Sequence, residues 1–129
     1  MKKFIILWFI LLVAFASLSF AGSKDVLRSL EKIKGGVEAG ITLHEYSNLI
    51  ADAKVEINLL KRSDFDNQQF MNATKKCLTS YMFSRDMWDF KIKFENMRSY
   101  TNAAECDDNM QEGWQKASKY LDMAYDSLN

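Results

Sequence analysis

The stretch from Ile41 to Arg62, ITLHEYSNLIADAKVEINLLKR, constrains the fold most strongly because every level of the helix code agrees there. Thr42 is a good N-cap, and Glu45 three residues later completes the pattern of a capping box. Six apolar residues recur at alternating spacings of three and four, namely Leu43, Tyr46, Ile50, Ala53, Ile57 and Leu60. This spacing places them on one face of a helix, so the segment needs partner helices to bury that face.

The first 21 residues have the pattern of a secretory signal peptide. Lys2 and Lys3 supply positive charge, residues 4–16 form an apolar run, and Ser19–Ala21 offers the small residues that signal peptidase recognises. The MKKF start is typical of bacterial proteins. We therefore expect cleavage after Ala21 and a periplasmic or secreted location. The alternative is an uncleaved membrane anchor, because the apolar stretch approaches the roughly 20 residues that span a bilayer.

The chain from residue 22 to residue 129 has the size of one domain and is too short for two. It carries 15 basic and 17 acidic residues, a net charge of −2, with neither sign gathered into a long block. This balance argues against nucleic-acid binding, which requires a basic patch. The chain has no proline and no internal repeat, which fits a compact helical bundle with short connections.

A helix is also expected before the Ile41–Arg62 stretch. Ser23 can cap it, the pair Gly35–Gly36 should fray or kink its last turn, and Gly40 fits the left-handed position that ends a helix. Its apolar stripe consists of Val26, Leu30, Ile33 and Val37. The first two helices should therefore form a tight antiparallel hairpin.

The third helix is expected to begin at Asp66, with Gln69 three residues later and Phe65 and Phe70 as a hydrophobic staple. Its apolar residues are too many for one stripe, so we expect it to contact partners on more than one side. They are Phe70, Met71, Leu78, Tyr81, Met82, Phe83, Met87, Trp88, Phe90, Ile92, Phe94 and Met97. The segment 90–95, FKIKFE, also alternates like a strand, but no second strand-like run exists to pair with it, so we predict helix.

Cys77 and Cys106 are the only cysteines, and an even pair in an oxidising compartment predicts one disulfide. Such a bond would stabilise the fold by about 3 to 4 kcal/mol. Two free buried thiols or a redox pair are the alternatives. The bond is barely reachable if the third helix runs straight to Met97, so we expect that helix to end or bend earlier. For the same reason the last helix should begin nearer Asp108 than Asn102.

The last helix carries a regular apolar stripe, formed by Met110, Trp114, Ala117, Leu121, Ala124 and Leu128. Tyr120 and Tyr125 flank this stripe, with Met123 beside them. Aromatic side chains with a methionine are typical of a protein-binding surface, whereas the structural alternative is packing at the rim of the core. Tyr120, Met123 and Tyr125 are therefore the candidate interaction residues.

The sequence offers no catalytic, cofactor-binding or metal-binding residues. His44 is the only histidine, and with Asn48 and Asp52 it makes a poor ligand set for a transition metal. The six methionines after residue 21 are spread among aromatic positions and are better explained as core filling than as copper or haem ligands. No nucleophile elbow or metalloprotease motif is present, so an enzymatic activity is unsupported.

Two segments, EAGITLHEYSNLIADAKVEINLLKR and WQKASKYLDMAYDSL, resemble segments of small secreted bacterial all-helical proteins of uncharacterised function. The resemblance implies an exported helical protein and brings no activity with it.

Together these signals predict an all-α domain over residues 22–129, an up-and-down bundle of three to four helices with one disulfide, preceded by a signal peptide at residues 1–21. The predicted function is an exported, non-enzymatic binding or interaction protein of the bacterial cell envelope, with a protein partner and no membrane contact after cleavage. One alternative is a carrier of a small ligand or cofactor, with a pocket between helices near Trp88 and Trp114. A second alternative is an interaction module tethered to the membrane by an uncleaved N-terminal segment.

Overall fold

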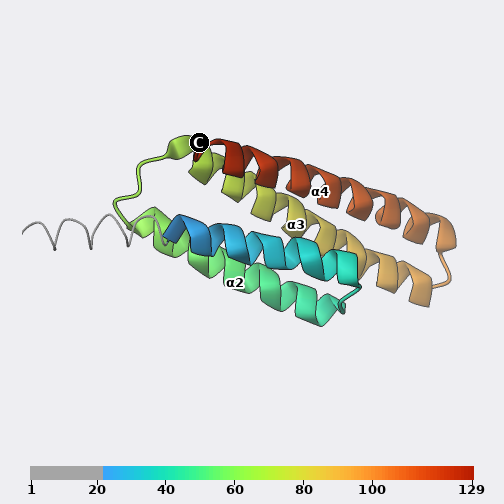
Figure 1. Cartoon of the computed structure of the whole chain (residues 1–129). Coiled ribbons are helices and arrows are strands. Elements are labelled where there is room, and N and C mark those ends of the chain that lie inside the picture. The colour runs from blue at the N-terminus through green and yellow to red at the C-terminus, as the bar shows by residue number, and fades with distance from the viewer. Residues whose placement is uncertain (1–21) are drawn as a thin grey trace, which may run out of the picture.

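A computed structural model describes residues 22–129, and all regular secondary structure in that range is helical. The N-terminal helix covers residues 22–39, and it is followed by α2 (Leu43–Arg62), α3 (Gln68–Asn96) and α4 (Tyr100–Asp126). The four helices lie side by side and alternate in direction, as Figure 1 shows. The predicted all-α, up-and-down bundle is thereby confirmed for the described residues. The predicted signal peptide lies at residues 1–21, outside them.

The start of α2 is built as its sequence predicts. The Glu45 backbone N–H donates to Thr42 Oγ1 at 3.1 Å, and the Thr42 N–H donates to Glu45 Oε2 at 3.3 Å. These two bonds form a capping box, which satisfies N–H groups that have no partner within the helix. Five members of the predicted stripe are buried, and they are Tyr46, Ile50, Ala53, Ile57 and Leu60.

The start of α3 lies one residue later than its sequence predicts. The N-cap is Asn67 rather than Asp66, and Asn67 Oδ1 accepts a hydrogen bond from the Phe70 N–H at 3.0 Å. The Asn67 side chain also donates from Nδ2 to the Ser127 carbonyl at 2.8 Å, so one residue caps α3 and holds the end of α4. Phe65 and Phe70 pack edge to face with ring centroids 5.3 Å apart, but with Asn67 as the N-cap they no longer occupy the N′ and N4 positions of a hydrophobic staple.

The predicted disulfide does not form, and Cys77 and Cys106 are free, buried thiols. The register of α3 against α4 explains this, because Lys91 Nζ pairs with Asp107 Oδ1 at 2.8 Å, one residue from Cys106. Cys77 lies fourteen residues before Lys91, which is about 21 Å along the helix axis. A disulfide requires Cα atoms within about 7 Å, so antiparallel packing in this register keeps the thiols apart.

The predicted end of α3 and the predicted start of α4 both depended on the disulfide, and both differ in the structure. Because no bond pulls the α3–α4 connection back, α3 continues to Asn96, and α4 begins at Tyr100 rather than near Asp108. A tight turn joins the two helices, and Arg98 adopts the left-handed conformation in it with φ of 57°. The N-terminal helix likewise continues through Gly35–Gly36 to residue 39 and ends at Gly40, whose φ is 81°.

The α3–α4 hairpin is longer than the hairpin formed by the N-terminal helix and α2. Figure 1 shows the end of α3 and the beginning of α4 extending past the connection between the first two helices. In this overhang α3 and α4 have only each other among the described helices. A four-helix core therefore gives way to a two-helix extension.

Candidate interaction surface

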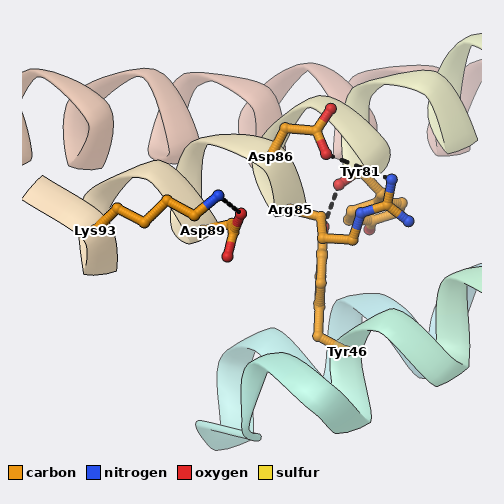
Figure 2. A network of polar contacts seen from close by, with 6 residues as sticks. All are labelled: Tyr46, Tyr81, Arg85, Asp86, Asp89 and Lys93. Carbon is orange, nitrogen blue, oxygen red and sulfur yellow. Dashed lines mark hydrogen bonds and ion pairs between the residues drawn. The ribbon is translucent and has the colours of Figure 1, made fainter.

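The covered side of α3 meets α2 and α4 around one buried tyrosine. The Tyr46 hydroxyl donates to the Tyr81 backbone carbonyl at 2.7 Å and accepts from Trp114 Nε1 at 3.2 Å. Figure 2 shows Tyr46 reaching from α2 to α3. Trp88 packs against Tyr46 and Trp114, with ring centroids 5.8 and 6.1 Å away. This aromatic cluster links three helices and closes the four-helix core beside the overhang.

Burial keeps the titratable groups of this covered side in their neutral forms. It raises the pKa of Tyr46 and of Tyr81 above the ordinary tyrosine value, because a charged phenolate would lose its hydration. Burial also raises the pKa of the Cys77 thiol to about 12, with a further contribution from the Glu31 carboxylate. A thiol with this pKa is protonated at neutral pH, so Cys77 lacks the thiolate of a reactive cysteine.

A different part of α3 carries apolar side chains that stay open to solvent. Phe83, Met87, Phe90, Phe94 and Met97 recur at spacings of four and three, and we call these five residues the open stripe. Phe83 and Phe90 are each 45% exposed and Met97 is 72% exposed, while Met87 and Phe94 are half-buried. Large apolar side chains gathered on one face of a helix are the kind of surface that binds a partner.

The open stripe lies on its own side of α3. The row that faces α4 contains Ser84, whose Oγ donates to the Met110 carbonyl at 2.8 Å, and Lys91, which pairs with Asp107. At about 100° per residue, the stripe is turned by roughly 100° from that row and lies nearly opposite Tyr81. Phe83 touches α4 at Gly113, but no helix in residues 22–129 fully buries any residue of the stripe.

Charged residues of both signs border the open stripe on the edge away from α4. Asp86 and Lys93 lie on this edge, and their side chains are 59% and 62% exposed. Each has a neighbour on its own helix, since Arg85 approaches Asp86 at 3.4 Å and Asp89 pairs with Lys93 at 2.9 Å (Figure 2). Exposed pairs of this kind contribute little stability and can exchange partners at small cost.

The three interaction residues expected from the sequence lie on two sides of α4. Met123 is exposed and lines a surface hollow of about 450 Å³ between the start of α3 and the end of α4. Tyr120 is half-buried, and Lys76 Nζ lies 5.7 Å from its ring centroid on the same side. Tyr125 points to the other side, where burial and the Glu31 carboxylate raise its pKa. Tyr120 and Met123 are thus brought together, and Tyr125 is not.

The remaining candidates for chemistry are dispersed. His44 is exposed at the second residue of α2, and among residues 22–129 no three histidine, cysteine or acidic side chains gather as a metal-binding group. None of the helices described here is long and apolar enough to cross a membrane.

Comparisons with protein-family models, with curated proteins and with solved structures found no match to this chain.

Sequence reasoning missed the open stripe although its spacing is readable in the sequence. Phe83, Phe90 and Met97 are seven residues apart, which is a helical repeat. Leu78, Tyr81 and other apolar residues occupy a second face of α3, so the apolar surface of the helix is too broad for one stripe. Such a pattern predicts several packing partners but does not say which face stays exposed. The structure supplies partners for one part of that surface and leaves the other part exposed.

Proposed function

We propose that this chain is an exported, non-enzymatic interaction protein of the bacterial cell envelope, and that it binds a protein partner through the open stripe of α3. The observation that carries the proposal is the exposure of Phe83, Phe90 and Met97 on one helical face. Keeping such side chains in water has a free-energy cost of about 25 cal/mol for each Å² of apolar surface. A partner that covers them recovers that free energy.

Two further observations support this reading. The groups with the most strongly raised pKa values, on Tyr46, Tyr81 and Cys77, are buried in the packed core. The open stripe instead offers contact area, with charged residues at its rim, which is how protein interfaces are arranged. The export part of the proposal rests on the charged, apolar and small-residue pattern of residues 1–21.

The test is photo-crosslinking in living cells with a benzoylphenylalanine placed at Phe90. The matched control is the same residue at Leu59 on α2, which is 56% exposed and also apolar. We expect a discrete adduct from position 90 and none from position 59. Failure to obtain an adduct at position 90, or the same adducts at both positions, would count against the proposal.

A small-ligand carrier is the second candidate, because a hollow of about 230 Å³ lies beside the aromatic cluster. Trp114, Tyr81 and Val37 line it, together with polar residues of the N-terminal helix and α4. A ligand bound there should change the tryptophan fluorescence. Titration with lipids, haem and metal ions tests this, and a spectrum that stays unchanged throughout would exclude a carrier role for those ligands.

The tethered alternative differs from the first proposal only at the N-terminus. If residues 1–21 remain attached, the same open stripe would act at the membrane surface. The intact mass of the protein recovered from its own cell envelope distinguishes the two, since a chain that begins at Gly22 has lost the segment.

A further inference from the structure

We infer that the open stripe binds a second copy of this chain, with the two α3 helices antiparallel across a two-fold axis. The inference rests on the proposed function of the same stripe and adds the identity of the partner. A two-fold interface uses the same patch on both copies, so the patch must complement itself. The shape, the length and the charges of the open stripe meet this requirement.

The spacing of the open stripe is that of a two-stranded helical seam. Residues at alternating steps of four and three occupy the a and d positions of a heptad repeat, which pack as knobs into holes of a facing helix. From Phe83 to Met97 the seam is about 21 Å long. On the same face the preceding positions are Ser80 and Lys76, so the apolar part has a defined beginning. Because the apolar seam is short and polar residues precede it, two α3 helices can align in only a few registers that pair apolar residues.

Antiparallel pairing uses nearly the whole seam when the axis passes between Met87 and Phe90. Met87 then contacts Phe90 of the partner subunit, and Phe83 contacts Phe94 of the partner subunit. Each contact occurs twice by symmetry. The three phenylalanines supply most of the contact area, and aromatic side chains are enriched in the centre of protein interfaces.

The charges on the free edge of α3 favour this orientation. On the other edge of the stripe α4 is already in place, because Lys91 is paired with Asp107. Asp86 and Lys93 occupy equivalent positions, seven residues apart, on the free edge. In the antiparallel register Asp86 approaches Lys93 of the partner subunit, and Lys93 approaches Asp86 of the partner subunit. Such edge pairs set partner choice and orientation in helical seams.

The same charges disfavour a lipid surface as the occupant. Helices that lie on anionic membranes carry Lys and Arg on the polar face beside their apolar residues. Here Asp86 and Asp89 border the open stripe together with Lys93. Acidic and basic side chains therefore both border the stripe, which suits a protein partner that presents the same charges in reverse order.

The first experiment measures the mass of the protein purified from its cell envelope by sedimentation over a range of concentrations. We expect a monomer–dimer equilibrium, and we expect Phe90→Glu to weaken dimerisation by at least about a hundredfold because it places two carboxylates at the centre of the seam. Leu59→Glu on α2 is the matched control and should leave the dimer intact. Circular dichroism should give equal helix content for both variants, since both positions are solvent-exposed.

The second experiment tests orientation by exchanging charges. Asp86→Lys and Lys93→Asp should each weaken self-association about tenfold or more, because each places like charges opposite one another at both edge contacts. An equimolar mixture of the two variants should regain dimerisation as a heterodimer, in which every edge contact again joins opposite charges. A parallel pairing, or a dimer through another surface, would give no such recovery.

Each outcome separates this inference from the proposed function. A wild-type protein that stays monomeric up to about 100 μM, while position 90 crosslinks to a different chain, overturns the second copy and retains the interaction function. A dimer that tolerates Phe90→Glu also overturns the inference. A monomer that binds phosphatidylethanolamine–phosphatidylglycerol vesicles, and loses this binding with Phe90→Glu, identifies lipid as the occupant. A monomer that neither crosslinks to another chain from position 90 nor binds vesicles would contradict both the inference and the proposed function.

Discussion

The covered and open sides of α3 carry similar apolar side chains and meet different surroundings. On the covered side Phe70, Cys77 and Tyr81 are buried, and the Tyr81 backbone carbonyl accepts a hydrogen bond from the Tyr46 hydroxyl. On the open side Phe83 and Phe90 keep nearly half of their surface in water. An apolar residue count therefore says how much surface a helix needs to bury, and the partners decide how much is buried within one chain.

Position along α3 separates the two sides further. The buried residues of α3 lie between Phe70 and Ser84, and the open stripe begins at Phe83 and continues to the end of the helix. Trp88 still packs against Tyr46 of α2, so the open stripe begins beside the four-helix core and continues into the overhang (Figure 1). We therefore expect the first half of α3 to determine folding stability and the second half to determine association.

The largest contrast should come from one substitution made on each side. Phe70→Ala removes a fully buried ring and should lower the free energy of unfolding by about 3–5 kcal/mol. Phe90→Ala removes a half-exposed ring and should lower it by less than about 1 kcal/mol. Urea unfolding measures both values, at a protein concentration low enough to keep the chain monomeric. Equal losses would mean that the open stripe is part of the folding core.

A second contrast compares two glycines that become alanine. Gly113 of α4 lies against α3, and a Cβ at this position would overlap Ser84 Oγ and lie 3.2 Å from the Ser80 carbonyl oxygen. Gly113→Ala should therefore destabilise the protein by about 1–3 kcal/mol, because two packed helices must separate to admit the methyl group. Thermal or urea unfolding of the purified variant gives the value.

Gly35 provides the control for this substitution. It lies in the N-terminal helix, and a Cβ there would meet no atom within 4 Å. Gly35→Ala should stabilise the protein by about 0.5–1 kcal/mol, because alanine loses less conformational entropy than glycine on forming a helix. If Gly113→Ala were also stabilising, the close approach of α3 and α4 at Ser84 would be wrong.

Local signals in the sequence were sufficient to predict the helices, and contacts distant in sequence decided the rest. Thr42 and Glu45 form a capping box because both are within one turn. Asp66 and Asn67 can each cap a helix, and the choice of Asn67 coincides with its bond to Ser127 at the other end of the chain. Propensity and spacing carry no information about that bond.

The disulfide was predicted wrongly for a related reason. Cysteine number and compartment favour a bond, but the distance between the thiols depends on the register of α3 against α4. Gly113 and Ser84 fit together in that register, and Lys91 meets Asp107. The exposure of the open stripe depends on the same kind of information, since long-range contacts decide which face of α3 meets α2 and α4. The spacing of the open-stripe residues can be read from the sequence, but their exposure to solvent cannot.

Removing the central hydroxyl of the covered side should have an intermediate effect. Tyr46→Phe deletes the bond to the Tyr81 carbonyl and the acceptor used by Trp114 Nε1, at a cost of about 1–2 kcal/mol. Tyr100→Phe, at a 67% exposed position, should change stability by less than about 0.5 kcal/mol. Urea unfolding at pH 7 measures the difference.

Alkaline pH should weaken the same region of the wild-type protein. Burial raises the pKa of Tyr46 and Tyr81 in the folded state, so the unfolded chain loses these protons first as the pH rises. Their contribution is present below the unfolded pKa of about 10 and is lost above it. For Cys77 the loss should extend from about pH 8.5 to its folded pKa of about 12. Tyr46→Phe should show a shallower decline above pH 10, and an unchanged slope would place Tyr46 outside the titrating core.

The smallest effect concerns how the overhang is held together. Lys91 and Asp107 are the interhelical ion pair there, and their side chains are 29% and 37% exposed. Because the pair is only partly shielded from water, a double-mutant cycle with Lys91→Met and Asp107→Asn should give a coupling energy of up to about 1 kcal/mol that decreases with added salt. The exposed pair Glu112–Lys116 on α4 should give about 0.5 kcal/mol or less. A coupling near zero at Lys91 would mean that buried Ala103 and Cys106 hold the overhang by packing alone. The Lys91–Asp107 pair would then contribute nothing to holding α3 and α4 together beside the open stripe, and the two halves of α3 would differ only in how many helices pack against them.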